Sequence, residues 1–239
     1  MMGNRLIHEV IPVGMLQCNC SVLGDSETRE AIVIDPGEEA ERILDVIQRH
    51  GFHVRAILCT HTHIDHVGAL AALRRATKAP VLIHEADLDT YRTLATQAQW
   101  LGIPTPEISE IDDFLREGET LRWAGFSVRV LHTPGHTPGS VSLVVESNGA
   151  GKTIPHAHSH TEQRSGTRSK PPGAERLIAG DTLFQGSIGR TDLPGGSFPQ
   201  IIKSIHEKLL VLPDDTPVYP GHGEPTTIGE ERTHNPFLR

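Results

Sequence analysis

Four side chains of types that bind metal ions lie within six consecutive residues, His61-Thr-His63-Ile-Asp65-His66. The segment follows an apolar run and precedes Val67, so we expect it to leave a strand and enter a helix. Side chains alternate along an extended chain, which puts His61 and His63 on one side. Asp65 and His66 can then face a second point close by, so the spacing predicts two adjacent metal ions. The alternative is a polar loop whose histidines only cap a helix. It does not account well for four ligand-type side chains so close together.

Three loops further along the chain each offer one more ligand. They contain His136 in TPGHTPG, Asp181 in AGDT and His222 in YPGHG, each beside a predicted strand. Glycine lets the backbone turn sharply and proline stiffens the loop, so these loops can bring a side chain from a strand end into a crowded centre. A single His or Asp in such a turn is usually structural. Together with the first segment, however, the three complete a set of metal ligands.

The elements that position these loops alternate between strand and helix. Alternating or β-branched apolar runs predict strands at 6–13, 18–23, 30–35, 53–60, 80–84, 126–132, 141–146, 176–179 and 217–219. Helical spacing of apolar residues predicts helices at 38–50, 67–77, 85–100 and 199–210. We therefore expect an α/β layered protein, with residues 1–239 forming a single domain.

Residues 148–175 depart from this pattern. The segment is rich in Gly, Ser, Thr, Pro, Arg and His and has almost no apolar periodicity, which predicts a flexible insertion within a hairpin. It contains the alternating histidines His156, His158 and His160. Because an unstructured loop gives them no fixed geometry, we predict no functional metal site there.

Composition excludes several classes of protein. The 22 basic and 30 acidic residues give a net charge of −8, which disfavours binding to nucleic acid. No run approaches the roughly 20 apolar residues that cross a bilayer, so we expect no membrane span. The amino terminus has no signal-peptide pattern, and Cys18, Cys20 and Cys59 form no disulfide framework. We therefore expect a cytoplasmic protein with free thiols, and its oligomeric state stays open.

With its ligands in this order, the sequence resembles the metallo-β-lactamase superfamily, and within it the short bacterial form of the glyoxalase II (hydroxyacylglutathione hydrolase) group. The resemblance runs from about Ile11 to the carboxyl terminus and implies a four-layer αββα sandwich. The implied ligands are His61, His63 and His136 for a first metal, Asp65, His66 and His222 for a second, and Asp181 as the bridge. Asp35 matches a family aspartate that orients the histidine loop, although a helix-entry role explains it almost as well.

Two divalent ions close together can lower the pKa of a shared water toward neutrality and so supply hydroxide without a serine or cysteine nucleophile. Asp65 and Asp181 are the carboxylates expected to take part in catalysis, and Asp181 would hold the metal pair together. The ligands favour zinc, and mixed His and carboxylate sites also accept iron or manganese.

Residues 180–196, GDTLFQGSIGRTDLPGG, resemble the thioesterase branch that hydrolyses S-(2-hydroxyacyl)glutathione, such as S-lactoylglutathione. The implied partner is thus a small-molecule thioester. Within this stretch, Arg190 could pair with a substrate carboxylate or, equally well, with Asp192.

A persulfide dioxygenase is the main alternative, with one iron held by His61, His136 and Asp181. A lactonase, a β-lactamase and a non-catalytic binding module are less favoured. Metal content separates the main classes, because two ions support a hydrolase, one iron supports a dioxygenase, and none supports a binding module.

Overall fold

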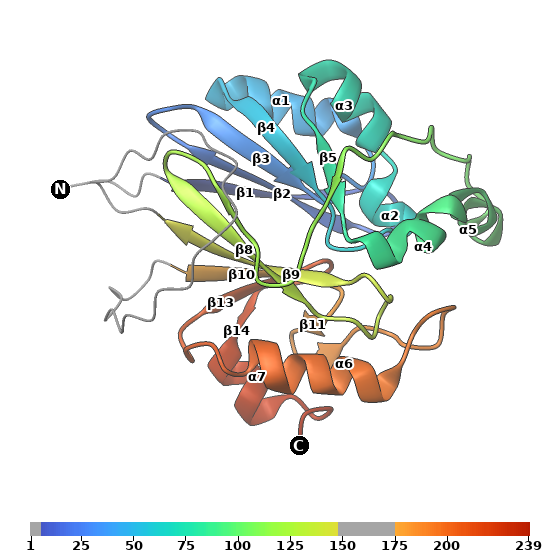
Figure 1. Cartoon of the computed structure of the whole chain (residues 1–239), viewed down its shortest axis with the longest axis vertical. Coiled ribbons are helices and arrows are strands. Elements are labelled where there is room, and N and C mark those ends of the chain that lie inside the picture. The colour runs from blue at the N-terminus through green and yellow to red at the C-terminus, as the bar shows by residue number, and fades with distance from the viewer. Residues whose placement is uncertain (1–5, 148–174) are drawn as a thin grey trace.

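The computed structural model describes residues 6–147 and 175–239, and these form four layers (Figure 1). Two six-stranded sheets face each other, with strand orders β1-β2-β3-β4-β5-β6 and β14-β13-β10-β9-β8-β7. Helices cover the outer face of each sheet. This is the αββα sandwich that the resemblance implied.

The first sheet contains β1 (Leu6–Val13), β2 (Cys18–Asp25), β3 (Glu30–Ile34), β4 (His53–Leu58), β5 (Val81–Ile83) and β6 (Asp113–Phe114). Strands β3 to β6 run parallel to one another. Parallel neighbours need crossover connections, which include the helices α1 (Ala40–His50) and α3 (Leu70–Thr77). Buried side chains such as Ile43 and Leu73 pack these helices on the sheet. The carboxyl ends of β3 and β4 therefore meet at one edge, where the first ligand loop begins.

The second sheet contains β7 (Thr120–Arg122), β8 (Phe126–His132), β9 (Val141–Ser147), β10 (Glu175–Gly180), β13 (Pro217–Pro220) and β14 (Thr226–Thr227). A small hairpin, β11 (Leu183–Phe184) and β12 (Ser187–Ile188), follows β10. The outer face is covered by α6 (Phe198–Ser204), a π-helical turn η2 (Ile205–Leu209) and α7 (Ile228–His234). Strands β9 and β10 pair antiparallel. The insertion predicted between them lies, except for Glu175, outside the described residues.

The predicted helix at 67–77 differs from the structure. The chain is already helical in α2 (Ile64–Val67), breaks, and resumes as α3. The break occurs because the amide of Ala69 donates to the carbonyl of Pro36 at 3.0 Å. Gly68 allows this approach, since a Cβ there would lie 2.4 Å from the carbonyl oxygen of Gly37. Asp65 and His66 therefore lie in a helical turn rather than in a bend before the helix.

The predicted helix at 85–100 is also divided, into a 3₁₀ turn η1 (Glu85–Asp87), α4 (Leu88–Arg92) and α5 (Leu94–Leu101). At the second junction both the amide and the hydroxyl of Thr93 donate to the carbonyl of Thr90, which replaces the regular helical hydrogen bond. The predicted helix at 199–210 likewise ends in the π-helical turn η2.

The cysteines agree with the prediction from composition. Cys18, Cys20 and Cys59 are free and buried in the core beneath the helices of the first sheet. Among the described residues, no helix has the length and apolar character to cross a membrane.

Candidate metal centre

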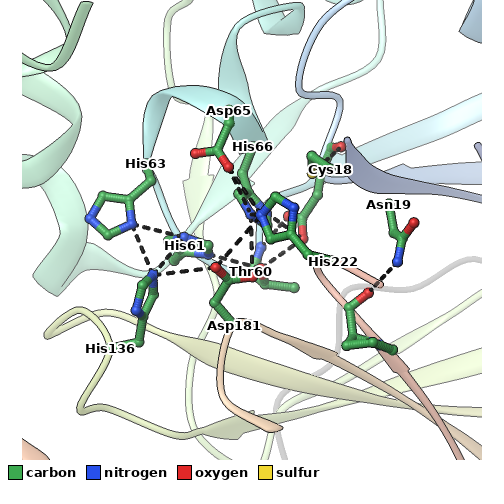
Figure 2. A network of polar contacts seen from close by, with 12 residues as sticks. Cys18, Asn19, Thr60, His61, His63, Asp65, His66, His136, Asp181 and His222 are labelled. Atoms are coloured by element: carbon green, nitrogen blue, oxygen red, sulfur yellow. Dashed lines mark hydrogen bonds and ion pairs between the residues drawn. The ribbon is translucent and has the colours of Figure 1, made fainter. Parts of the chain in front are cut away.

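The predicted ligands meet where strand ends of the two sheets face each other (Figure 2). Four of them follow β4 of the first sheet and three follow strands of the second sheet. The first group is His61, His63, Asp65 and His66, and the second is His136 after β8, Asp181 after β10 and His222 after β13. Segments up to 161 residues apart in the sequence thus form one site, counted from His61 to His222.

Three imidazole nitrogens converge on one point. His61 Nε2 lies 3.1 Å from His63 Nδ1, which lies 2.9 Å from His136 Nε2. The third side of the triangle, from His136 Nε2 to His61 Nε2, is 3.2 Å. Nitrogens bound to one zinc ion at about 2.0–2.1 Å with tetrahedral angles lie about 3.3 Å apart. The three nitrogens therefore have the spacing of ligands around a single ion.

Hydrogen bonds at Nδ1, the ring nitrogen that points away from the centre, fix the tautomers of two of these histidines. In both rings Nε2 then carries the lone pair that faces the centre. His136 Nδ1 lies 2.8 Å from the carbonyl oxygen of Arg190, which can only accept, so Nδ1 carries the hydrogen. The Thr60 hydroxyl donates to Asp35 at 2.7 Å, so it accepts from His61 Nδ1 at 3.2 Å. In the neutral rings both Nε2 atoms are then acceptors facing each other. The lone pairs of two such acceptors repel each other, and a cation bound between them would remove this repulsion. The set of donor atoms therefore fits a metal cation.

A second group lies beside the first. His66 Nε2 and His222 Nε2 are 3.3 Å apart, and Asp65 Oδ2 lies 3.7 Å and 3.1 Å from them, respectively. His222 Nδ1 donates to the carbonyl of Leu16 at 2.9 Å, which leaves its Nε2 free to bind an ion. Two imidazoles and a carboxylate at these distances fit a second cation.

Asp181 lies between the two groups (Figure 2). Its Oδ2 is 3.6 Å from His136 Nε2 and its Oδ1 is 3.4 Å from His66 Nε2. Oδ1 is buried and makes no hydrogen bond of ordinary geometry to any residue in the described ranges. A buried carboxylate oxygen of this kind calls for a cation. Asp181 also forms a possible ligand group with His61 and His66.

Burial governs the electrostatics of the centre. Burial, with added repulsion from the His66 and His136 rings, holds the pKa of His61 well below its usual range. Burial and then His136 lower the pKa of His63 to about 4. Burial alone would raise the pKa of Asp181, but the nearby His66 and His136 rings outweigh it and keep that pKa low. The first group therefore offers neutral His61 and His63 rings beside an ionised carboxylate, the forms that bind metals. In the second group burial also disfavours the charged rings, but Asp65 and Asp181, and for His66 also Cys18, outweigh it and raise the pKa of His66 and His222.

Asp35 contacts the histidine loop directly. Its Oδ1 accepts from the amide of Thr60 and its Oδ2 from the Thr60 hydroxyl, both at 2.7 Å. Its Oδ2 also lies 3.1 Å from His66 Nδ1. Helix α1 begins only at Ala40, with Glu39 at its N-cap. Of the two roles that the sequence left open for Asp35, these contacts favour the orienting one.

Arg190 makes two separate contacts. Its guanidinium pairs with the carboxylate of Asp192 through two hydrogen bonds of 2.8 Å, which is one of the two arrangements left open by the sequence. Its backbone carbonyl accepts the hydrogen bond from His136. The backbone of Arg190 therefore orients a predicted ligand, while its side chain is exposed at the surface.

Supporting residues outside the ligand set were missed in the sequence. Asn19 donates from Nδ2 to the carbonyls of Pro220 and Gly223, on either side of His222. Gln97 accepts from the amide of Ile64 at the start of α2. Their partners lie at least 33 residues away in the sequence, so no local pattern pointed to them.

Comparison with known proteins gives consistent matches. The family model described as the metallo-beta-lactamase superfamily matches residues 13–150 and 146–222. A protein of Haemophilus influenzae named hydroxyacylglutathione hydrolase GloC is 39% identical, over 96% of this chain and 97% of its own length. The crystal structure of the BLEG-1 B3 metallo-beta-lactamase matches with a TM-score of 0.79 and 36% identity, over 97% of this chain and 99% of that one. The crystal structure of TTHA1623 in a di-iron-bound form matches with a TM-score of 0.74 and 37% identity, over 96% and 100% of the two chains.

Proposed function

The chain belongs to the metallo-beta-lactamase superfamily of metal-dependent hydrolases, and from this premise we propose that it hydrolyses thioesters of the S-(2-hydroxyacyl)glutathione class, such as S-lactoylglutathione. The observation that carries the proposal is the placement of Asp181 between two groups of converging ligands. The near full-length similarity to a protein named hydroxyacylglutathione hydrolase supports the choice of substrate class.

We assign the ligands as the sequence predicted. The first ion would be held by His61, His63 and His136, the second by Asp65, His66 and His222, with Asp181 shared. Two divalent cations, when bound, polarise the thioester carbonyl and make a water molecule acidic enough to act as the nucleophile. These ligands favour zinc, and imidazole and carboxylate donors also accept iron or manganese.

The chain itself contributes orientation. The carbonyls of Arg190 and Leu16 fix the tautomers of His136 and His222, so that each ring presents a lone pair to the site. Asp35 Oδ2 lies 3.1 Å from His66 Nδ1, a distance at which the carboxylate can orient this ring as well. Asp181 supplies negative charge between the two groups, which balances the charge of two cations at close range. None of these roles requires a serine or cysteine nucleophile.

A direct test measures metal content and substrate preference together. The purified protein should contain two ions per chain and hydrolyse S-lactoylglutathione faster than a β-lactam such as nitrocefin. One iron per chain, with oxygen consumption on a glutathione persulfide, would instead support the dioxygenase alternative. Faster hydrolysis of nitrocefin would support β-lactamase activity. Nitrocefin is included because the structure is similar to that of the BLEG-1 metallo-beta-lactamase.

We expect Arg190→Ala to raise KM for a glutathione thioester by roughly 10-fold while changing kcat little. The guanidinium is exposed and paired only with Asp192 in the described structure, and a surface ion pair contributes little, so a substrate carboxylate can displace Asp192. The hydrogen bond to His136 uses the backbone carbonyl and survives the substitution. Steady-state kinetics on S-lactoylglutathione measures both constants.

A small neutral thioester serves as the control substrate for Arg190→Ala. Because it has no carboxylate, its KM should stay near the wild-type value. Equal losses on the charged and neutral substrates would show that Arg190 acts by holding the loop beside Asp181. The variant Asp192→Ala adds a second check, since it frees the guanidinium and should leave the KM for the charged substrate unchanged or lower.

A further inference from the structure

Asp87 is a fully buried carboxylate at the end of η1, outside the proposed ligand set. Its Oδ2 accepts hydrogen bonds from the amide of Thr62 and the hydroxyl of Thr137, both at 2.9 Å. Its Oδ1 accepts from the amide of Gly139 at 2.6 Å. In addition, the Thr62 hydroxyl donates to the Asp87 carbonyl at 3.0 Å. One side chain therefore joins three segments of the chain.

The partners of Asp87 are neighbours of the first group of ligands. Thr62 lies between His61 and His63, and Thr137 directly follows His136. The two loops joined by Asp87 belong to different sheets and supply all three imidazoles of the first group. Among its hydrogen-bond partners, none borders His222 of the second group.

Local packing shows that this contact is tight. A Cβ at Gly139 would lie 2.6 Å from the Asp87 amide nitrogen and 2.7 Å from its Cβ. Only glycine permits this approach without movement of the backbone of η1. The close packing and the four hydrogen bonds together fix the separation of the two loops.

We propose that Asp87 is a positioning residue that sets the distance between the His61–His63 loop and the His136 loop, and so determines the metal affinity of the first site selectively. The inference rests on the proposed metal centre but not on the thioester substrate. Asp87 acts through Thr62 and Thr137 and contacts none of the proposed ligand atoms. Without its side chain the two loops keep their connection to their own sheets and the hydrogen bond from the amide of Val141 to the carbonyl of Thr60, but lose the hydrogen bonds to the Asp87 carboxylate.

The test measures two zinc dissociation constants per chain by competition with a chelator. The variants His136→Ala and His222→Ala identify which constant belongs to which site. In Asp87→Ala the constant of the first site should rise by about 10-fold to 100-fold, and that of the second site should change less than about 3-fold.

Asp87→Asn keeps the shape of the side chain and tests the hydrogen bonds alone. Both carboxylate oxygens accept from a backbone amide, so the NH₂ group of asparagine faces a donor in either orientation. We expect the first-site constant to rise by about 3-fold to 10-fold. Thr137→Val removes a single hydrogen bond to Asp87 and should give a smaller rise at the same site. These two variants keep the test decisive if Asp87→Ala does not fold.

Asp25 provides a matched control. It is a buried aspartate that accepts from the amides of Glu27 and Thr28 at 2.8 Å, and it lies at the opposite end of β2 from the metal centre. Asp25→Asn and Asp25→Ala should lower stability without a selective change in either constant. Equal changes at both sites, or unchanged constants in the Asp87 variants, would overturn the inference alone. A wild-type chain that binds no metal would overturn the metal centre and this inference with it.

Discussion

Replacing Asp181 with alanine is expected to lower kcat/KM for S-lactoylglutathione by about three orders of magnitude or more. The carboxylate lies between the two ligand groups, 3.6 Å from His136 and 3.4 Å from His66. Its loss removes the ligand that both metal ions would share, and with it the negative charge that would balance their positive charges. Steady-state kinetics and metal analysis of the same preparation measure the effect.

Asp181→Asn separates charge from shape in this experiment, because it keeps one oxygen and loses the negative charge. Its rate should lie between those of the wild type and the alanine variant. Asp192→Ala, an exposed carboxylate in the same loop region, is the control and should retain a near wild-type turnover number. Wild-type rate and metal content in Asp181→Ala would contradict the two-metal mechanism.

Removal of metal should abolish thioester hydrolysis, and one divalent ion added back at a time should restore it only when both sites are filled. Binding to the folded state at 1,000 times the dissociation constant stabilises a protein by about 4 kcal/mol per site. For a chain of this size that corresponds to a fall in Tm of roughly 10 °C or more on chelation. Calorimetry with and without a chelator, together with rate measurements, tests both effects.

The variant His222→Ala is a useful comparison in the chelation experiment, because it should bind one ion and respond less to the chelator. A metal-free preparation that kept the full rate would rule out metal-dependent hydrolysis. Oxygen consumption on a glutathione persulfide with a single iron bound would point instead to the dioxygenase alternative.

Sequence patterns located the longer elements well. The bounds of β1 at 6–13 were predicted in full, and the helix predicted at 38–50 begins at Ala40. Both elements are long enough for the periodicity of their apolar residues to be recognised. Two-residue strands, such as β6 and β14, are too short for this and were missed, as was α7. The break after α2 was also beyond local patterns, since it depends on a hydrogen bond to Pro36 in another loop.

The structure brings together the ligand set predicted from the sequence. The dense His and Asp residues at 61–66 are a strong local signal, and the single ligands in the glycine turns become informative only together with them. The supporting residues gave no such signal. Thr60 and Asp87 are common residue types. Asp35, which holds Thr60, and the side-chain partners of Asp87 lie 25 or more residues away, and a single sequence does not reveal such pairs. The role of Asp35 stayed open for the same reason, and its contacts with Thr60 and His66 favour the orienting one.

Main-chain carbonyls, rather than side chains, fix the tautomers of His136 and His222. The residues that own these carbonyls, Arg190 and Leu16, can therefore change identity during evolution without disturbing the rings they orient. Both side chains are exposed at the surface beside the metal centre. The orientation of the two rings thus requires a constant backbone path at these positions. The two side chains can be substituted, which allows substrate preference to change while the metal ligands stay in place.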